Sequence, residues 1–163
     1  MQTAHPASAN GSNYPWIAYY PDGVAWDMPI IPAPLPVVLE QAAAEFANNA
    51  AISFMGKITT YAALVRKVDQ VAAGLQQIGV KKGTKVGLFL PNTPTFIIYY
   101  YAILKAGGTV VNFNPLYTLE ELTFQVKDSD TEIMVTHDLQ ALFPKLEALV
   151  SKGVLARIIA VPF

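Results

Sequence analysis

The residues best suited to acid–base or metal chemistry in this sequence are a histidine and the aspartate after it, His137-Asp138. They follow a short apolar segment that predicts a strand, and a strand end is a permitted place for a catalytic or metal site. However, no H-x-x-x-H motif and no further carboxylate stands at metal-ligand spacing around them. We therefore expect Asp138 to cap the next helix and His137 to be a partly exposed imidazole.

A pair of adjacent carboxylates, Glu120-Glu121, is the second candidate for acid–base chemistry. The segment Thr118 to Glu121 has the form of a capping box, which opens a helix. Successive helix residues point about 100° apart, so the two carboxylates do not converge on one substrate. Capping and interaction with the helix dipole are the expected roles.

Phosphate-binding and nucleophile motifs are absent from the sequence. It contains no G-x-x-x-x-G-K-[ST], no G-x-G-x-x-G and no G-x-S-x-G. The segment Lys82–Lys85 has similar letters but precedes a predicted strand, so it cannot form a cradle at a helix N-terminus and is expected to be a solvated turn. Gly107-Gly108 follows a predicted helix and is expected to end it.

Three asparagines lie near predicted strand ends, where α/β proteins bind ligands. They are Asn92, Asn112 and Asn114. Asn92 can present its amide to a ligand or cap the following helix, and the cap is favoured. The other two are expected to be satisfied by loop backbone. The loops at which a ligand site is expected, if there is one, are 91–94, 114–117 and 136–139.

The elements that would position these residues alternate along the chain. Apolar periodicity and turn signals predict strands at 51–54, 58–59, 85–90, 109–113, 132–136 and 157–161, and helices at 37–49, 60–78, 93–106, 118–128 and 138–152. The helix over 60–78 has the clearest stripe, with Thr59 or Thr60 as its cap and Gly79 after its end. This alternation predicts an α/β fold with a mainly parallel sheet flanked by helices.

Three regions differ in composition. Residues 1–13 predict a disordered tail, residues 14–36 a Pro- and aromatic-rich extended arm, and residues 37–163 an α/β domain. The chain is 53% hydrophobic and only 14% charged, so part of its surface is expected to face a partner or the rest of a larger protein.

Charge and cysteine content exclude several classes of protein. The net charge is −1 and the Lys and Arg residues are scattered, which argues against nucleic acid as a partner. There is no cysteine, so disulfides, thiolate metal sites and Cys nucleophiles are excluded. No signal peptide is recognised, and the longest apolar run, 96–104, is about half a bilayer span.

Several segments resemble a known family when read in order. Residues 82–92 (KGTKVGLFLPN), 103–108 (ILKAGG) and 111–122 (VNFNPLYTLEEL) resemble successive motifs of the adenylate-forming enzymes. Pro15-Trp16 with residues 20–24 (YPDGV), and residues 54–61 (FMGKITTY), resemble the bacterial long-chain fatty-acid–CoA ligases. The NPLYT form is shared with 4-coumarate–CoA ligases.

The resemblance implies the N-terminal part of the adenylate-forming enzyme fold, incomplete relative to a full-length enzyme. Full-length members activate a fatty acid with ATP and Mg²⁺ and transfer the acyl group to coenzyme A. Their catalytic residues lie downstream of the segments matched here. No catalytic, cofactor-binding or metal-ligating residue is therefore expected in this chain, no cofactor is expected in this fragment, and the fragment is expected to be inactive alone.

Alternatives remain open. The chain can belong to another acid–CoA ligase branch, 4-coumarate-like or aryl, or act as a non-catalytic binding or dimerisation module of the same fold. The resemblance also suggests a homodimer through the N-terminal arm. The expected location is the cytoplasm, either free or peripheral to the inner face of the membrane.

Overall fold

The computed structural model describes residues 14–163, so the predicted tail over 1–13 lies outside the described residues. The chain forms two compact units, Met1–Pro32 and Ala33–Phe163. In the first, the 3-10 helix η1 (Ile17–Tyr19) stands in the sequence between members of a small aromatic cluster. The ring of Tyr14 stacks on Trp16 at 4.6 Å and meets Trp26 at 4.8 Å between ring centroids.

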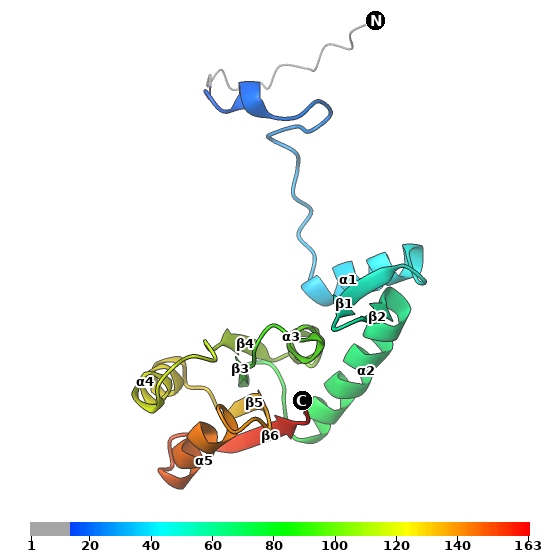
Figure 1. Cartoon of the computed structure of the whole chain (residues 1–163). Helices are drawn as coiled ribbons and strands as arrows, with labels where there is room; N and C mark the ends of the chain where they lie inside the picture. The colour runs from blue at the N-terminus through cyan, green and yellow to red at the C-terminus, as the bar shows by residue number, and fades with distance from the viewer. Residues whose placement is uncertain (1–13) are drawn as a thin grey trace, which may run out of the picture. The chain divides into compact units, whose positions relative to one another are not determined.

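The second unit alternates helices and strands, as the sequence predicts (Figure 1). Its elements are α1 (Leu35–Glu45), β1 (Ala50–Phe54), β2 (Lys57–Thr60), α2 (Tyr61–Gln77), β3 (Lys85–Phe89), α3 (Pro94–Lys105), β4 (Thr109–Asn112), α4 (Leu119–Ser129), β5 (Ile133–His137), α5 (Phe143–Ser151) and β6 (Arg157–Val161). Strands β1 and β2 form an antiparallel hairpin, and the other four form a parallel sheet in the order β4-β3-β5-β6. The predicted α/β class with a parallel sheet is confirmed.

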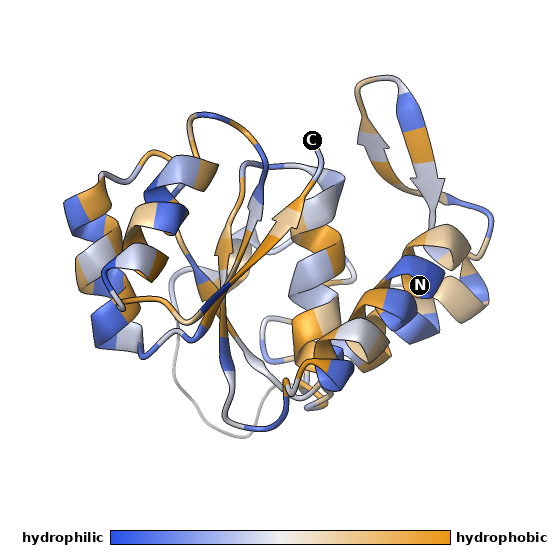
Figure 2. Ribbon diagram, turned by 90° about the horizontal axis from the view of Figure 1, so that it is seen from below, coloured by the Kyte–Doolittle hydropathy of each residue, from blue (hydrophilic) through white to orange (hydrophobic). Residues whose placement is uncertain are grey.

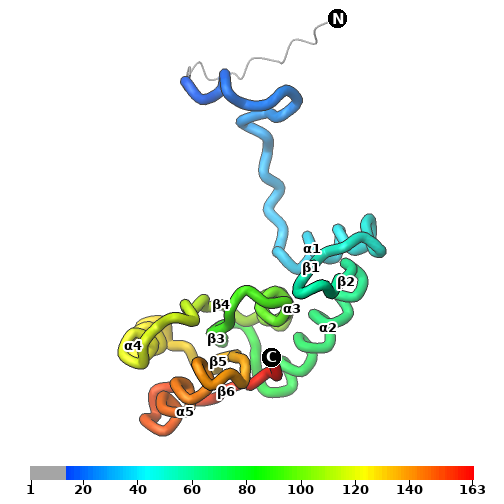
Figure 3. The backbone as a smooth tube through the Cα atoms, viewed as in Figure 1, coloured from blue at the N-terminus to red at the C-terminus, as the bar shows by residue number. Residues whose placement is uncertain are grey.

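The sheet is covered on both faces, which explains why its strands are so apolar. Successive strand side chains point to opposite faces. Val86, Leu88 and Val135 pack in one cluster with side chains of α2 and α3, whereas Phe89 and Met134 pack in another with those of α4 and α5. The strands run between these two groups of helices in the hydropathy view (Figure 2), and the backbone tube shows the same layers (Figure 3).

Gly87, at the centre of β3, lets the second cluster close over the sheet. It lies opposite Met134 of β5 in the parallel register. A Cβ atom on Gly87 would overlap Met134 Sδ and lie 2.8 Å from Phe113 Cε2. Because Met134 and Phe113 are both buried, no larger residue fits at position 87 without displacing them.

Helix α2 is capped at both ends as the sequence predicts. The Thr60 hydroxyl accepts a hydrogen bond from the backbone N–H of Ala63 at 3.3 Å. Gly79, with φ +98°, follows the last turn, and the N–H of Val80 donates to the carbonyl of Leu75 at 2.9 Å. The buried stripe is Leu64, Val68, Ala72 and Leu75, whereas Ile78, the C-cap residue, is exposed.

Two helix starts differ from the prediction because of proline. Helix α1 begins at Leu35, two residues before the predicted start, since Pro36 in its first turn needs no hydrogen-bond acceptor. Helix α5 begins at Phe143 with Pro144 in the first turn, not at Asp138. The predicted capping role of Asp138 is therefore wrong.

Candidate functional site at the carboxyl edge of the sheet

The ends of β3, β5 and β6 meet at the carboxyl edge of the parallel sheet, where a ligand site was expected. His137 is the last residue of β5 and lies opposite Val161 of β6. Its Nε2 atom lies 3.1 Å from the Thr93 hydroxyl, and its Nδ1 atom lies 3.1 Å from the Val161 carbonyl. The ring of Phe163 meets the imidazole edge-on at 5.1 Å between centroids.

The expectation of a partly exposed His137 is wrong. The residue is only 2% exposed, because its strand lies between two others and its ring contacts Thr93 and Phe163. A carbonyl oxygen can only accept, so Nδ1 carries the proton donated to Val161, and in the neutral ring Nε2 accepts from Thr93. With both nitrogens bonded internally, His137 joins β5, β6 and α3 and has no nitrogen free to ligate a metal.

Asp138 also bonds within the chain. Its Oδ1 atom accepts a hydrogen bond from the backbone N–H of Phe163 at 3.1 Å, and its own N–H donates to the Val161 carbonyl at 3.2 Å. The His137-Asp138 pair therefore fastens the segment after β6 to the end of β5.

The three asparagines divide between loop and surface. The N-cap of α3 is Thr93, with Asn92 exposed before it, so the predicted cap by Asn92 is wrong. Thr93 makes no side-chain capping bond, because its hydroxyl is bonded to His137. The Asn114 Oδ1 atom accepts from the Leu116 N–H at 3.0 Å, as the loop interpretation predicts. Asn112 is exposed at the end of β4.

Glu121 is held in the predicted capping box. Its Oε2 atom accepts from the Thr118 N–H at 2.8 Å and from the Thr118 hydroxyl at 2.9 Å, and the Glu121 N–H donates to the Thr118 oxygen at 3.3 Å. These hydrogen bonds from the Thr118 backbone and side chain lower the pKa of the Glu121 carboxyl. A lowered pKa keeps this carboxylate ionised, as suits a cap and not a general acid.

The lysine- and glycine-containing turns are structural. The Thr84 hydroxyl accepts from the Lys81 N–H at 3.2 Å within the turn, and the Lys85 ammonium pairs with the Asp130 carboxylate at 2.9 Å. Gly107, with φ +92°, ends α3 as predicted.

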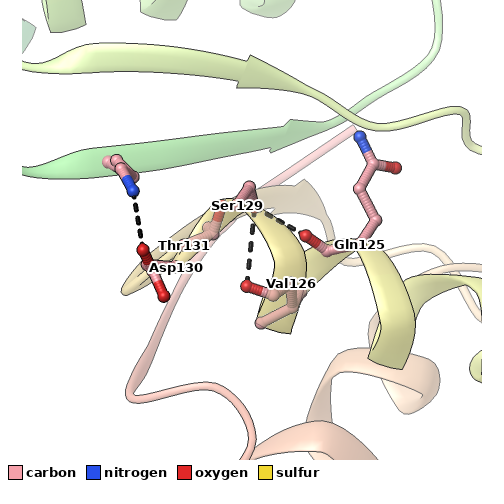
Figure 4. Close-up of polar contacts among 6 residues, drawn as sticks. Gln125, Val126, Ser129, Asp130 and Thr131 are labelled. Carbon is pink, nitrogen blue, oxygen red and sulfur yellow. Dashed lines mark hydrogen bonds and ion pairs between the residues drawn. The ribbon is translucent and has the colours of Figure 1, made fainter.

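At the end of α4, beside the Lys85–Asp130 ion pair, side-chain hydroxyls bond to a backbone carbonyl and to one another (Figure 4). The Ser129 hydroxyl donates to the Gln125 carbonyl at 2.6 Å and lies 2.7 Å from the Thr131 hydroxyl. The Gln125 Nε2 atom donates to the Asn112 carbonyl at 3.0 Å, which ties α4 to the end of β4.

Two further features were not found by sequence reasoning. Tyr117, Glu120, Glu121, Phe124 and Gln125 line an open depression on α4. Lys105 of α3 pairs with Glu40 of α1 and Asp69 of α2. The residues of the depression stand three or four positions apart, a spacing that places them on one face of a helix and that could have revealed them. Nothing in the linear spacing of Lys105, Glu40 and Asp69 brings those three together. Across residues 14–163 no group of three or more His, Asp or Glu residues is placed to hold a metal ion.

The sequence model of the AMP-binding enzyme family matches residues 39–161, which is most of the chain and includes every element of the parallel sheet. The chain belongs to this family. Thr93, His137 and Val161 lie within the segment that matches this family, and they are hydrogen-bonded to one another.

The proteins to which this chain is similar include several CoA ligases. The chain is 42% identical over 134 residues to the long-chain-fatty-acid–CoA ligase of Bacillus subtilis, which covers 82% of this chain and 24% of that protein. It is 35% identical over 100 residues to 4-coumarate–CoA ligase 4 of Arabidopsis thaliana, covering 61% of this chain and 17% of that protein. The chain thus spans about a quarter or less of the length of these relatives.

The fold matches solved ligases as well. A crystal structure of a long-chain-fatty-acid–CoA ligase from Archaeoglobus fulgidus superposes with a TM-score of 0.72 at 26% identity, covering 78% of this chain and 27% of that one. This confirms that the AMP-binding segment has the architecture found in adenylate-forming ligases. Among the helices of residues 14–163, none combines the length and apolarity needed to cross a membrane.

Proposed function

We propose that this chain is the N-terminal segment of an ATP-dependent long-chain fatty-acid–CoA ligase. The whole enzyme would form an acyl adenylate from a fatty acid and ATP with Mg²⁺, then transfer the acyl group to coenzyme A. The observation that carries the proposal is the 42% identity to the Bacillus subtilis ligase over 134 residues. A match of 134 residues extends beyond the parallel sheet, whose strands and connecting helices lie within residues 85–161.

Within that enzyme, the segment would serve as scaffold and would contribute no catalytic, cofactor-binding or metal-ligating side chain. The residues in hand do not fit ATP or Mg²⁺: His137, Thr93 and Asp138 are bonded within the chain, and Glu121 is held by its own helix cap. The segment alone would therefore be inactive. We assign no step of the reaction to its side chains.

A second candidate is another acid–CoA ligase branch, and the similarity to a 4-coumarate–CoA ligase supports it. A dimerisation module is a third, with the aromatic residues of 14–36 as contacts between two copies. The proposal places the protein in the cytoplasm or at the inner face of the membrane, where ATP and coenzyme A are supplied.

A pair of chimeras tests which branch this segment belongs to. The matched 134 residues replace their counterpart in the Bacillus subtilis ligase, and the matched 100 residues replace theirs in the Arabidopsis ligase. We expect the first chimera to keep long-chain acyl-CoA synthesis and the second to lose most of its activity. The reverse result would assign the chain to the 4-coumarate–CoA ligase branch.

The isolated chain tests the scaffold role. Incubation with ATP, Mg²⁺, a long-chain fatty acid and coenzyme A should release no pyrophosphate above the level without protein. Turnover by the pure chain would overturn the proposal. Sedimentation of the same sample, with and without residues 14–36, reports whether the arm joins two copies.

A further inference from the structure

We propose that α1 is a releasable latch, a short helix that detaches from the rest of the domain while the parallel sheet and its other helices stay folded. The inference concerns the 163-residue chain by itself and does not depend on the reaction proposed above. It rests on two observations: α1 buries only one side chain, and an exposed ion pair links it to α3.

The apolar attachment of α1 is small. The helix has 11 residues, and Leu39 is its only buried one. Leu35 and Val38 remain 46% and 47% exposed. By contrast, α2 buries four side chains over its length. Buried apolar area is the main source of docking free energy for a helix, so α1 should be held less strongly than α2 and than α3, which buries two side chains.

The polar attachment of α1 is one ionic cluster. The Lys105 ammonium of α3 lies 2.5 Å from Glu40 Oε1 of α1 and 2.5 Å from Asp69 Oδ1 of α2. Glu40 is the only member of the cluster that belongs to α1. Both carboxylates are about half exposed, at 45% and 48%, so dissolved salt reaches the cluster and screens it.

The helix has little stability of its own once it detaches. Its N-cap is Pro34, which offers no side-chain acceptor, and its first turn holds no acidic residue. An isolated helix shorter than about 12–15 residues is marginal in water. Detachment of α1 would therefore appear as unfolding of residues 35–45, with loss of their amide protection.

The latch should respond to salt and not to pH near neutrality. Hydrogen bonds to Asp69 and Glu40 raise the pKa of Lys105, so its charge persists well above pH 7. Salt at about 1 M shortens the screening length to about 3 Å and weakens the pairs.

Amide hydrogen exchange on the full chain tests the latch, with Glu40→Gln and Asp69→Asn as a matched pair. Each variant removes one carboxylate from Lys105, but only Glu40→Gln cuts the bond to α1. We expect exchange in residues 35–45 to be faster than in α2 and α3 already in the wild type. Glu40→Gln should speed it by about threefold to fivefold, the upper part of the range for an exposed ion pair.

Asp69→Asn should leave exchange in α1 within about twofold of the wild type, since Lys105 keeps Glu40. High salt should reproduce the effect of Glu40→Gln in the unmutated chain, which needs no variant to fold. The proposal is overturned if α1 exchanges as slowly as α3, or if both variants change α1 equally.

Discussion

The Nε2 atom of His137 lies 3.1 Å from the hydroxyl of Thr93, and this bond joins the end of β5 to the N-cap of α3. Both residues are buried. The same imidazole bonds to the Val161 carbonyl through Nδ1, so one side chain fastens three elements at the carboxyl edge of the sheet.

Replacing Thr93 by valine keeps the shape of the side chain and removes the hydroxyl. His137 Nε2 would then be buried without a partner, and the free energy of unfolding should fall by about 1–3 kcal/mol. Urea denaturation measures this loss. Thr95→Val, two residues along the same helix, is the control and should change stability by under about 0.5 kcal/mol. Equal effects of the two variants would mean that the bond contributes nothing.

Two glycines should respond to alanine in opposite directions. Gly87→Ala places a Cβ against Met134 and Phe113, which should destabilise the domain by about 1–3 kcal/mol. Gly74→Ala, in the middle of α2, meets nothing within 4 Å and should stabilise it by about 0.5–1 kcal/mol. Thermal or urea unfolding of both variants gives the comparison. A neutral Gly87→Ala would show that the Met134 side chain moves aside freely.

Glu121 should make stability depend on acid pH. Its pKa is lower in the folded protein than in the unfolded chain, so its contribution is present above the unfolded pKa, near 4.5, and is lost as pH falls through the folded value. The wild type should exceed Glu121→Gln in stability at pH 7, and the difference should disappear in acid. Glu120→Gln, which removes a neighbouring carboxylate outside the cap, is the control. A difference that persists at low pH would contradict the role of the charge.

Tryptophan spectroscopy can follow the aromatic cluster of the first unit. Both tryptophans of the chain, Trp16 and Trp26, lie there, so tryptophan signals arise from this unit alone. Tyr14→Ala removes the ring that contacts both, and the near-ultraviolet circular dichroism of tryptophan should weaken markedly. Tyr19→Ala alters a ring that is 87% exposed and should leave that signal almost unchanged. An unaltered spectrum in Tyr14→Ala would mean that the cluster does not persist in solution.

Local signals in the sequence were enough to predict most of the fold. The start of α4 follows from the Thr118–Glu121 box, the end of α2 from Gly79, and the strand Arg157–Val161 from its apolar run. Each of these depends on neighbours within a few positions along the chain. Both prolines that mark helix starts, Pro36 and Pro144, were less informative, because proline fits several positions of a first turn.

The carboxyl edge was less predictable because its partners are distant in sequence. His137 is bonded to Thr93, 44 positions earlier, and to Val161, 24 positions later. The sequence predicted Thr93 at the start of a helix with Asn92 as its cap, and the bond from Thr93 to His137 depends on strand order. The Lys105 cluster likewise joins three helices. Contacts between residues so far apart in the chain leave no periodic pattern in a single sequence.

The order of strands in the sheet also constrains how the chain is assembled during synthesis. β3 is central, yet β5, one of its two neighbours, follows only after β4 and α4. From Lys85 to Ile133 the ribosome needs roughly 2–10 s at typical rates. During that interval one side of β3 has no strand beside it, and the places of Met134 beside Gly87 and of His137 beside Thr93 are empty. The nascent chain must keep this apolar edge from pairing wrongly until β5 emerges.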